Sequence, residues 1–167
     1  MSSLEAATRH ILARLAAHAV PAAVVGGLAV SARTEPRFTR DADVCVAIES
    51  DAEAEALIRD LRSDGYEVGA LVEQESTGRI ATVRLDAPDA GGGVIVDLLF
   101  ASSGIEAEIT ATAEVIELFE GLDAPVATIG ALIALKLLAR DDARRPQDRV
   151  DLVALCRVAS RSDLHEA

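Results

Sequence analysis

The sequence predicts an α+β fold, in which helices flank a mixed β-sheet and a helical segment forms the C-terminal part. Half of the 167 residues are apolar, which is enough to build one proper core. Helical and strand-like patterns alternate first, several strand-like segments follow, and the last part of the chain is mostly helical. We therefore expect one domain over residues 1–167, with its core at about 20–125 and C-terminal helices at about 128–160.

The N-terminal segment predicts a helix, a short strand and a second helix. Residues 3–19 carry apolar side chains at helical spacing, and Pro21 ends that helix. The stretch "AAVVGG" then forms a short strand that closes on two glycines. We expect the next helix, in "GLAVSARTE", to begin at Gly27.

The next two segments are a strand and a clear helix. In "DADVCVAI" (41–48) the apolar residues alternate poorly with polar ones, which predicts a strand that is buried on both faces. The stretch "SDAEAEALIRDLRSDG" (50–65) predicts a helix for which Ser50 or Asp51 can serve as the N-cap. Gly65 lies just past the end of that helix.

The remaining elements follow from turn signals and apolar spacing. Three strands separated by Gly, Asp and Pro are expected in "YEVGALVE", "RIATVRLDA" and "GGVIVDLLFA". Residues 105–119 predict a helix followed by a strand. A strong helix starts at about Ile129, and the last one has Pro146 near its first turn.

Composition excludes several classes of protein. The formal charge of −12 disfavours broad contact with nucleic-acid phosphates, although arginines gather in the C-terminal quarter, at 140, 144, 145, 149, 157 and 161. Only two cysteines are present, Cys45 and Cys156, and they lie far apart, so we expect neither a disulfide framework nor a zinc site. No apolar stretch has the length of a membrane span, and the charged N-terminus is unlike a signal peptide. We expect a cytoplasmic protein without a membrane partner.

The stretch "RFTRDADVCV" places Asp41 and Asp43 one residue apart at the start of the buried strand. Alternate residues of a strand point to the same face, so both carboxylates should point the same way. With 14 aspartates, such a pair arises roughly once by chance, so its context decides its meaning. Two carboxylates at the start of a buried strand are costly without a compensating cation, and Mg²⁺ prefers oxygen ligands.

Two further features complete the pattern. In "VVGGLAVSAR" a strand runs into Gly26 and Gly27 and then directly into a helix, where free backbone N–H groups attract an anion. Asp97 interrupts the otherwise apolar strand "GVIVDLLF". Three carboxylates on adjacent strands can hold two metal ions, which activate a hydroxyl and stabilise an in-line displacement at phosphorus.

The pattern "GG…RFTRDADVCV…VIVDLLF" resembles the nucleotidyltransferase superfamily with the DNA polymerase β-like fold. The run "IGALIALKLLARDDARRPQDRVDL" is similar to the AbiEii-like group, the toxin-type nucleotidyltransferases. The resemblance covers about residues 20 to 155 and implies a nucleotidyltransferase-like fold. The sequence departs from the family pattern at Gly27, where many members have Ser.

The resemblance implies a site and its chemistry. A nucleoside monophosphate would pass from a nucleoside triphosphate such as ATP to an acceptor hydroxyl, with two Mg²⁺ ions, or Mn²⁺ in their place. The acceptor would be a tRNA, a protein or a small alcohol, and a toxin would have an antitoxin partner. The residues implied as catalytic and metal-binding are Asp41, Asp43 and Asp97, and those implied as nucleotide-binding are Gly26, Gly27, Arg37, Thr39, Lys136 and Asp148.

Two other interpretations remain open at this point. The chain could be a nucleotidyltransferase-like module that binds nucleotide without activity, for which the Gly27 departure and the short length argue. The acidic residues could also be surface charges of a structural protein. Asp148 and Asp151 could equally cap or salt-bridge the last helix.

Overall fold

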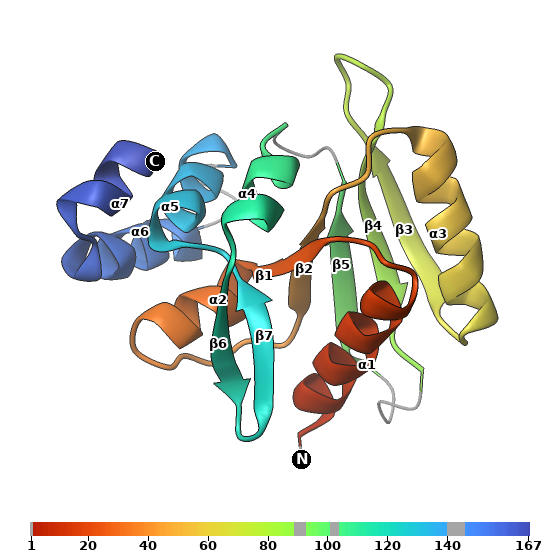
Figure 1. The fold of residues 1–167 in the computed structure, drawn as a ribbon, viewed down its shortest axis with the longest axis horizontal. Helices are drawn as coiled ribbons and strands as arrows, with labels where there is room; N and C mark the ends of the chain where they lie inside the picture. The colour runs from red at the N-terminus through yellow and green to blue at the C-terminus, as the bar shows by residue number, and fades with distance from the viewer. Residues whose placement is uncertain (1, 89–92, 101–103, 140–145) are drawn as a thin grey trace.

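The computed structural model describes residues 2–88, 93–100, 104–139 and 146–167. Within these residues seven helices flank one seven-stranded sheet, which confirms the predicted α+β fold (Figure 1). The helices are α1 (Ser3–Ala17), α2 (Gly26–Arg33), α3 (Asp51–Ser63), α4 (Glu106–Thr112), α5 (Ile129–Leu138), α6 (Pro146–Val158) and α7 (Arg161–Glu166). The strands are β1 (Ala22–Val25), β2 (Ala42–Val46), β3 (Glu67–Glu73), β4 (Ile80–Asp86), β5 (Ile95–Leu99), β6 (Glu114–Phe119) and β7 (Leu122–Val126).

The sheet is mixed, with the strand order β3-β4-β5-β2-β1-β7-β6. Strand β2 lies in the middle, antiparallel to β1 and parallel to β5. Strand β1 is parallel to β7, and the hairpins β3–β4 and β6–β7 form the two ends of the sheet. The central strands are the most buried, which agrees with the prediction that the strand containing Asp43 is covered on both faces.

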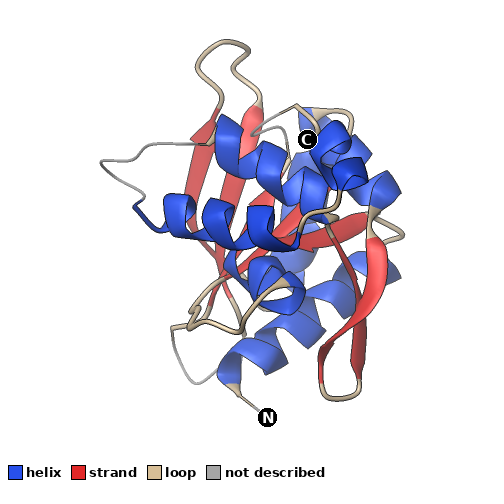
Figure 2. Cartoon of the chain, turned by 90° about the vertical axis from the view of Figure 1, so that its left-hand side faces the viewer, coloured by secondary structure: helices blue, strands red, loops and turns tan. Residues whose placement is uncertain are grey.

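Two hydrophobic clusters cover the two faces. On one face, α1 and α3 insert Ile11 and Leu61 against the apolar side chains of β2, β4 and β5. The second cluster joins β1 and β7 to α2, α4, α5 and α6, with Leu132 and Leu155 fully buried. Helices α5, α6 and α7 therefore gather beside one half of the sheet, away from α1 and α3 (Figures 1 and 2).

The boundaries of two elements differ from the sequence expectation. Helix α2 begins at Gly26 rather than at Gly27, because Gly26 adopts a left-handed φ of +61° that turns the extended chain of β1 directly into the helix. Helix α1 ends at Ala17, and Ala19, with φ of +55°, redirects the chain before Pro21. No helix in the described part of the chain is long and apolar enough to cross a membrane.

Candidate active site

Asp43 and Asp97 lie side by side at the centre of the sheet. They are direct register partners on the parallel strands β2 and β5, so their side chains point to the same face of the sheet. The pKa of Asp43 is raised to about 6, first by burial and then by the negative charges of Asp97 and Asp41. The three carboxylates that the sequence singled out therefore share one local environment.

The glycine turn packs directly against Asp43. Val25, the last residue of β1, is the register partner of Asp43, and Gly26 follows at once. A Cβ atom on Gly26 would overlap the carboxylate of Asp43, so this position has no space for a side chain. A backbone hydrogen bond from Gly27 to Asp43 lowers the pKa of that carboxyl and partly offsets the effect of burial. The turn and the carboxylates thus form one site.

Arg37 and Thr39 occupy the space beside Gly27. A Cβ atom on Gly27 would lie 2.7 Å from Nη2 of Arg37 and 2.9 Å from Oγ1 of Thr39. A larger residue at this position would have to displace the guanidinium. The segment before β2 thus folds back over the turn and packs against Gly27.

Arg37, Lys136, Asp148 and Asp151 form a connected group that we call the Lys136 network. The Nζ atom of Lys136 lies 2.6 Å from Oδ1 of Asp148 and 2.9 Å from Oδ2 of Asp151, and Nη2 of Arg37 lies 2.8 Å from the same oxygen of Asp151. These contacts tie α5 and α6 to the segment before β2. Lys136 also lowers the pKa of Asp43, so its charge acts on the carboxylate site.

The Lys136 network is deeply buried. Asp151 is 1% exposed and Asp148 is 7% exposed. Burial by itself raises the pKa of Asp151, but hydrogen bonds from Lys136, Gln147 and Arg37 and the charge of Lys136 outweigh it, and the pKa is lowered. Within the described residues, Oδ2 of Asp148 and Nε of Arg37 are buried without a hydrogen-bond partner.

Arg84 contacts Asp97 from the side of the site that is opposite to the Lys136 network. Nε of Arg84 lies 2.9 Å from Oδ1 of Asp97, and Nη2 lies 2.7 Å from Oδ2. The two residues are register partners on β4 and β5. The pKa of Arg84 is raised, chiefly by its hydrogen bond with Asp97 and then by the charge of Asp97.

The carboxylates suit a divalent cation in their chemistry. Asp41, Asp43 and Asp97 offer only oxygen donors, and burial together with the charges of Asp97 and Asp41 raises the pKa of Asp43. As they stand, however, no three His, Cys, Asp or Glu side chains within the described ranges are arranged to hold an ion. Arg84 occupies both oxygens of Asp97.

The structure brings the expected residues to one place, since the carboxylates, the glycine turn, Arg37, Thr39, Lys136 and Asp148 all belong to these contacts. Two residues of this site are not among the predicted site residues. The sequence indicated for Asp151 only a cap or a salt bridge of the last helix. Its spacing of three from Asp148 on α6 was the signal that both side chains share a helix face. Arg84 was missed, although it is a charged residue within an apolar strand. The arginines at 140, 144 and 145 lie outside the described residues.

The fold and this arrangement place the chain in the nucleotidyltransferase class. A family model described as "Nucleotidyl transferase AbiEii toxin, Type IV TA system" matches residues 10–167, so the chain belongs to the AbiEii nucleotidyltransferase family. This confirms the resemblance that the motifs indicated. No curated protein matches the sequence.

Solved structures with a similar fold are also nucleotidyltransferases by name. The antibiotic-resistance factor ANT(2'')-Ia aligns with a TM-score of 0.64 at 20% identity, over 99% of this chain and 89% of that one. The lincosamide antibiotic adenylyltransferase LnuA aligns with a TM-score of 0.58 at 14% identity, over 93% of this chain and 98% of that one. An antigenic nucleotidyltransferase-like protein from Paracoccidioides brasiliensis aligns with a TM-score of 0.59 at 18% identity, over 97% of this chain and 80% of that one. At these identities the likeness shows the fold alone.

Proposed function

We propose that this protein is a metal-dependent nucleotidyltransferase that moves a nucleoside monophosphate from a nucleoside triphosphate to an acceptor hydroxyl. One observation carries the proposal. Asp43 and Asp97 are neighbours on one face of parallel strands, Asp43 lies directly beside the turn at Gly26, and the charge of Lys136 acts on Asp43. A cation site and an anion site next to each other are what phosphoryl-group transfer requires.

The carboxylates of Asp41 and Asp43 would hold Mg²⁺, or Mn²⁺ in its place, and Asp97 would take part in holding a second ion. Bound there, the metal would supply activation of the acceptor hydroxyl and stabilisation of charge at the α-phosphate. Asp97 would accept the proton of that hydroxyl. These roles follow the donor chemistry and the shared environment of the three side chains.

The residues around the glycine turn would position the triphosphate. Gly26 and Gly27 begin α2, and the free backbone N–H groups of its first turn would attract a phosphate. Lys136 would act as a point charge on the phosphates. The buried Nε of Arg37 and Oδ2 of Asp148, which have no partner within the described residues, would gain one from the nucleotide, with Thr39 beside them.

The class of acceptor hydroxyl is proposed from the relatives of this chain. The family is described as a toxin of a type IV toxin–antitoxin system, and one structural neighbour is a complex of ANT(2'') with adenylyl-2''-tobramycin. A tRNA, a protein hydroxyl and a small alcohol are therefore the three classes to test. We propose the toxin role on the strength of the family match, with an antitoxin encoded in the neighbouring reading frame.

The test is transfer of label from each nucleoside triphosphate in a cell lysate with Mg²⁺. The wild type should label one class of acceptor, and Asp43→Ala should lower the rate by about a hundredfold or more, since it removes a central metal ligand. Asp123→Ala, which removes an exposed carboxylate from β7, is the matched control and should transfer normally. Equal rates for Asp43→Ala and the wild type would rule out this mechanism.

A nucleotide-binding module without activity is the alternative, and one observation favours it. Arg84 already neutralises Asp97 and occupies both of its oxygens. Calorimetry with Mg²⁺ and each nucleoside triphosphate separates the two functions. Tight nucleotide binding without transfer to any lysate component would establish the module.

A further inference from the structure

The contact between Arg84 and Asp97 places a protein cation where a metal ion would bind. Two hydrogen bonds, of 2.9 and 2.7 Å, join the guanidinium to the two carboxylate oxygens. A bidentate pair of this kind is among the stronger charge-assisted contacts in proteins. Because the residues are register partners on β4 and β5, Arg84 approaches from the same face as Asp43.

The two partners differ in their freedom to move. The side chain of Arg84 is 48% exposed, whereas that of Asp97 is 12% exposed. Arg84 can therefore turn its guanidinium into water, while Asp97 stays within the sheet and needs another cation in its place. The charges of Asp41 and Asp43 also raise the pKa of Arg84, so its guanidinium compensates the whole carboxylate group.

We propose that Arg84 holds Asp97 in the metal-free protein and is exchanged for the divalent cation when the metal binds. This inference rests on the proposed function, because it assigns a role to Arg84 in loading the same site. Asp97 has two carboxylate oxygens, and Arg84 engages both. A metal ion needs at least one of them, and a guanidinium beside it would repel it.

The exchange has a measurable consequence for metal affinity. The apparent affinity of a ligand is reduced by the fraction of protein that is competent to bind it. If Arg84 engages Asp97 nine-tenths of the time, the metal binds about tenfold more weakly than it would to a vacant carboxylate. Removal of Arg84 should therefore strengthen metal binding, whereas a residue that orients Asp97 for the metal would weaken binding when removed.

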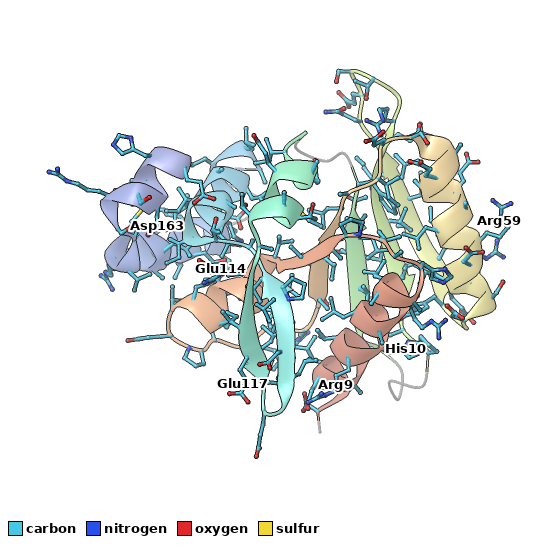
Figure 3. The ribbon with its side chains drawn as sticks, in the orientation of Figure 1. Arg9, His10, Arg59, Glu114, Glu117 and Asp163 are labelled. Atoms are coloured by element: carbon cyan, nitrogen blue, oxygen red, sulfur yellow. The ribbon has the colours of Figure 1, made fainter. Side chains whose placement is uncertain are left out.

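The test is Mn²⁺ binding to the full chain without nucleotide, followed by electron paramagnetic resonance of the unbound ion. Arg84→Gln should bind Mn²⁺ about tenfold more tightly than the wild type. Arg59→Gln is the matched control because it removes the same charge from the exposed outer side of α3, far from the site (Figure 3). Arg59→Gln should leave the affinity unchanged.

Two further variants identify the cause. Arg84→Lys keeps the charge but cannot form the two parallel hydrogen bonds, so it should show a smaller gain, roughly two- to threefold. If Arg84→Gln fails to fold, Arg84→Lys replaces it as the test variant. In a background of Asp97→Asn, the gain from Arg84→Gln should vanish, because the negative charge and one of the two oxygens for which Arg84 and the metal compete are then gone.

The outcomes separate this inference from the proposed function. If the wild type binds Mn²⁺ and transfers nucleotide, but Arg84→Gln binds no more tightly than Arg59→Gln, the exchange is overturned and the function stands. Weaker binding by Arg84→Gln would also overturn it and would make Arg84 a residue that positions Asp97. If no variant binds Mn²⁺ and no nucleotide is transferred, the proposed function fails together with it.

Discussion

The Lys136 network and the Arg84–Asp97 pair flank the same carboxylate site with the same chemical groups, but they differ in burial. In the Lys136 network, Asp151 is 1% exposed and is shared by Lys136 and Arg37. In the other group, the side chain of Arg84 is half exposed, and its hydrogen-bond partner among the described residues is Asp97. Water screens Arg84 more strongly than it screens the cations around Asp151, so the same kind of contact can be structural on one side and exchangeable on the other.

The strongest way to test this comparison is to make the same substitution on both sides. Asp151→Asn leaves Arg37 without its buried counter-charge and leaves Lys136 with Asp148 alone, and it should lower the free energy of unfolding by about 3 kcal/mol. Asp97→Asn returns Arg84 to water and relieves the repulsion on Asp43, so it should change the free energy of unfolding by less than about 1 kcal/mol. Urea denaturation in metal-free buffer, followed by circular dichroism, measures both values.

The control for this pair is Asp123→Asn, on an exposed position of β7, which should have almost no effect. If Asp97→Asn proved as costly as Asp151→Asn, the two sides of the site would be energetically alike. The assignment of Arg84 as an exchangeable partner would then lose its physical basis.

The glycine turn between the two groups provides the second test. Gly26 and Gly78 have similar left-handed φ angles, +61° and +67°, but only Gly26 faces the carboxylate of Asp43. Gly78→Ala should cost about 1 kcal/mol for the backbone alone. Gly26→Ala should cost about 2–4 kcal/mol, because the new Cβ also collides with Asp43. Thermal unfolding of both variants measures the difference, and equal losses would mean that Asp43 can move away.

The sequence could predict the alignment of the central carboxylates, because it depends on strand pattern. Asp43 and Asp97 each lie in a short apolar segment, and adjacent buried strands bring such positions together. The polar partners depend on how distant elements dock. Arg84 reaches Asp97 only through the register of β4 on β5, and Asp151 meets Lys136 only through the packing of α6 on α5.

Local boundaries show the same limit of sequence patterns. The turn at Gly26 was recognised, but the first residue of α2 depends on a left-handed conformation that glycine permits without requiring. Helix α7 has six residues, and none of them is buried. No periodic apolar pattern in the sequence therefore predicts this helix. The close approach of the Arg37 side chain to Gly27 is likewise visible only in the tertiary structure.

The last prediction concerns the pH dependence of the free energy of unfolding, to which Asp43 and Asp151 contribute with opposite sign. The pKa of Asp43 is raised from 3.8 to about 6, so the folded protein binds this proton more tightly than the unfolded chain does. Its contribution to stability, about 3 kcal/mol in full, is therefore present below the unfolded-state pKa of 3.8 and is lost as the pH rises through 6. The pKa of Asp151 is lowered, so its contribution is present above pH 3.8 and is lost as the pH falls through its folded-state value.

The variant Asp43→Asn isolates the first of these contributions. The free energy of unfolding of the wild type minus that of Asp43→Asn, measured in urea from pH 4 to pH 7.5 without metal, should fall by about 2 kcal/mol as the pH rises. Asp123→Asn, compared in the same way, should give a flat difference. A flat difference for Asp43→Asn as well would show that its carboxylate is already fully compensated in the folded protein. Arg84 and Lys136 would then suffice as counter-charges, and the site would have no electrostatic need for a metal ion.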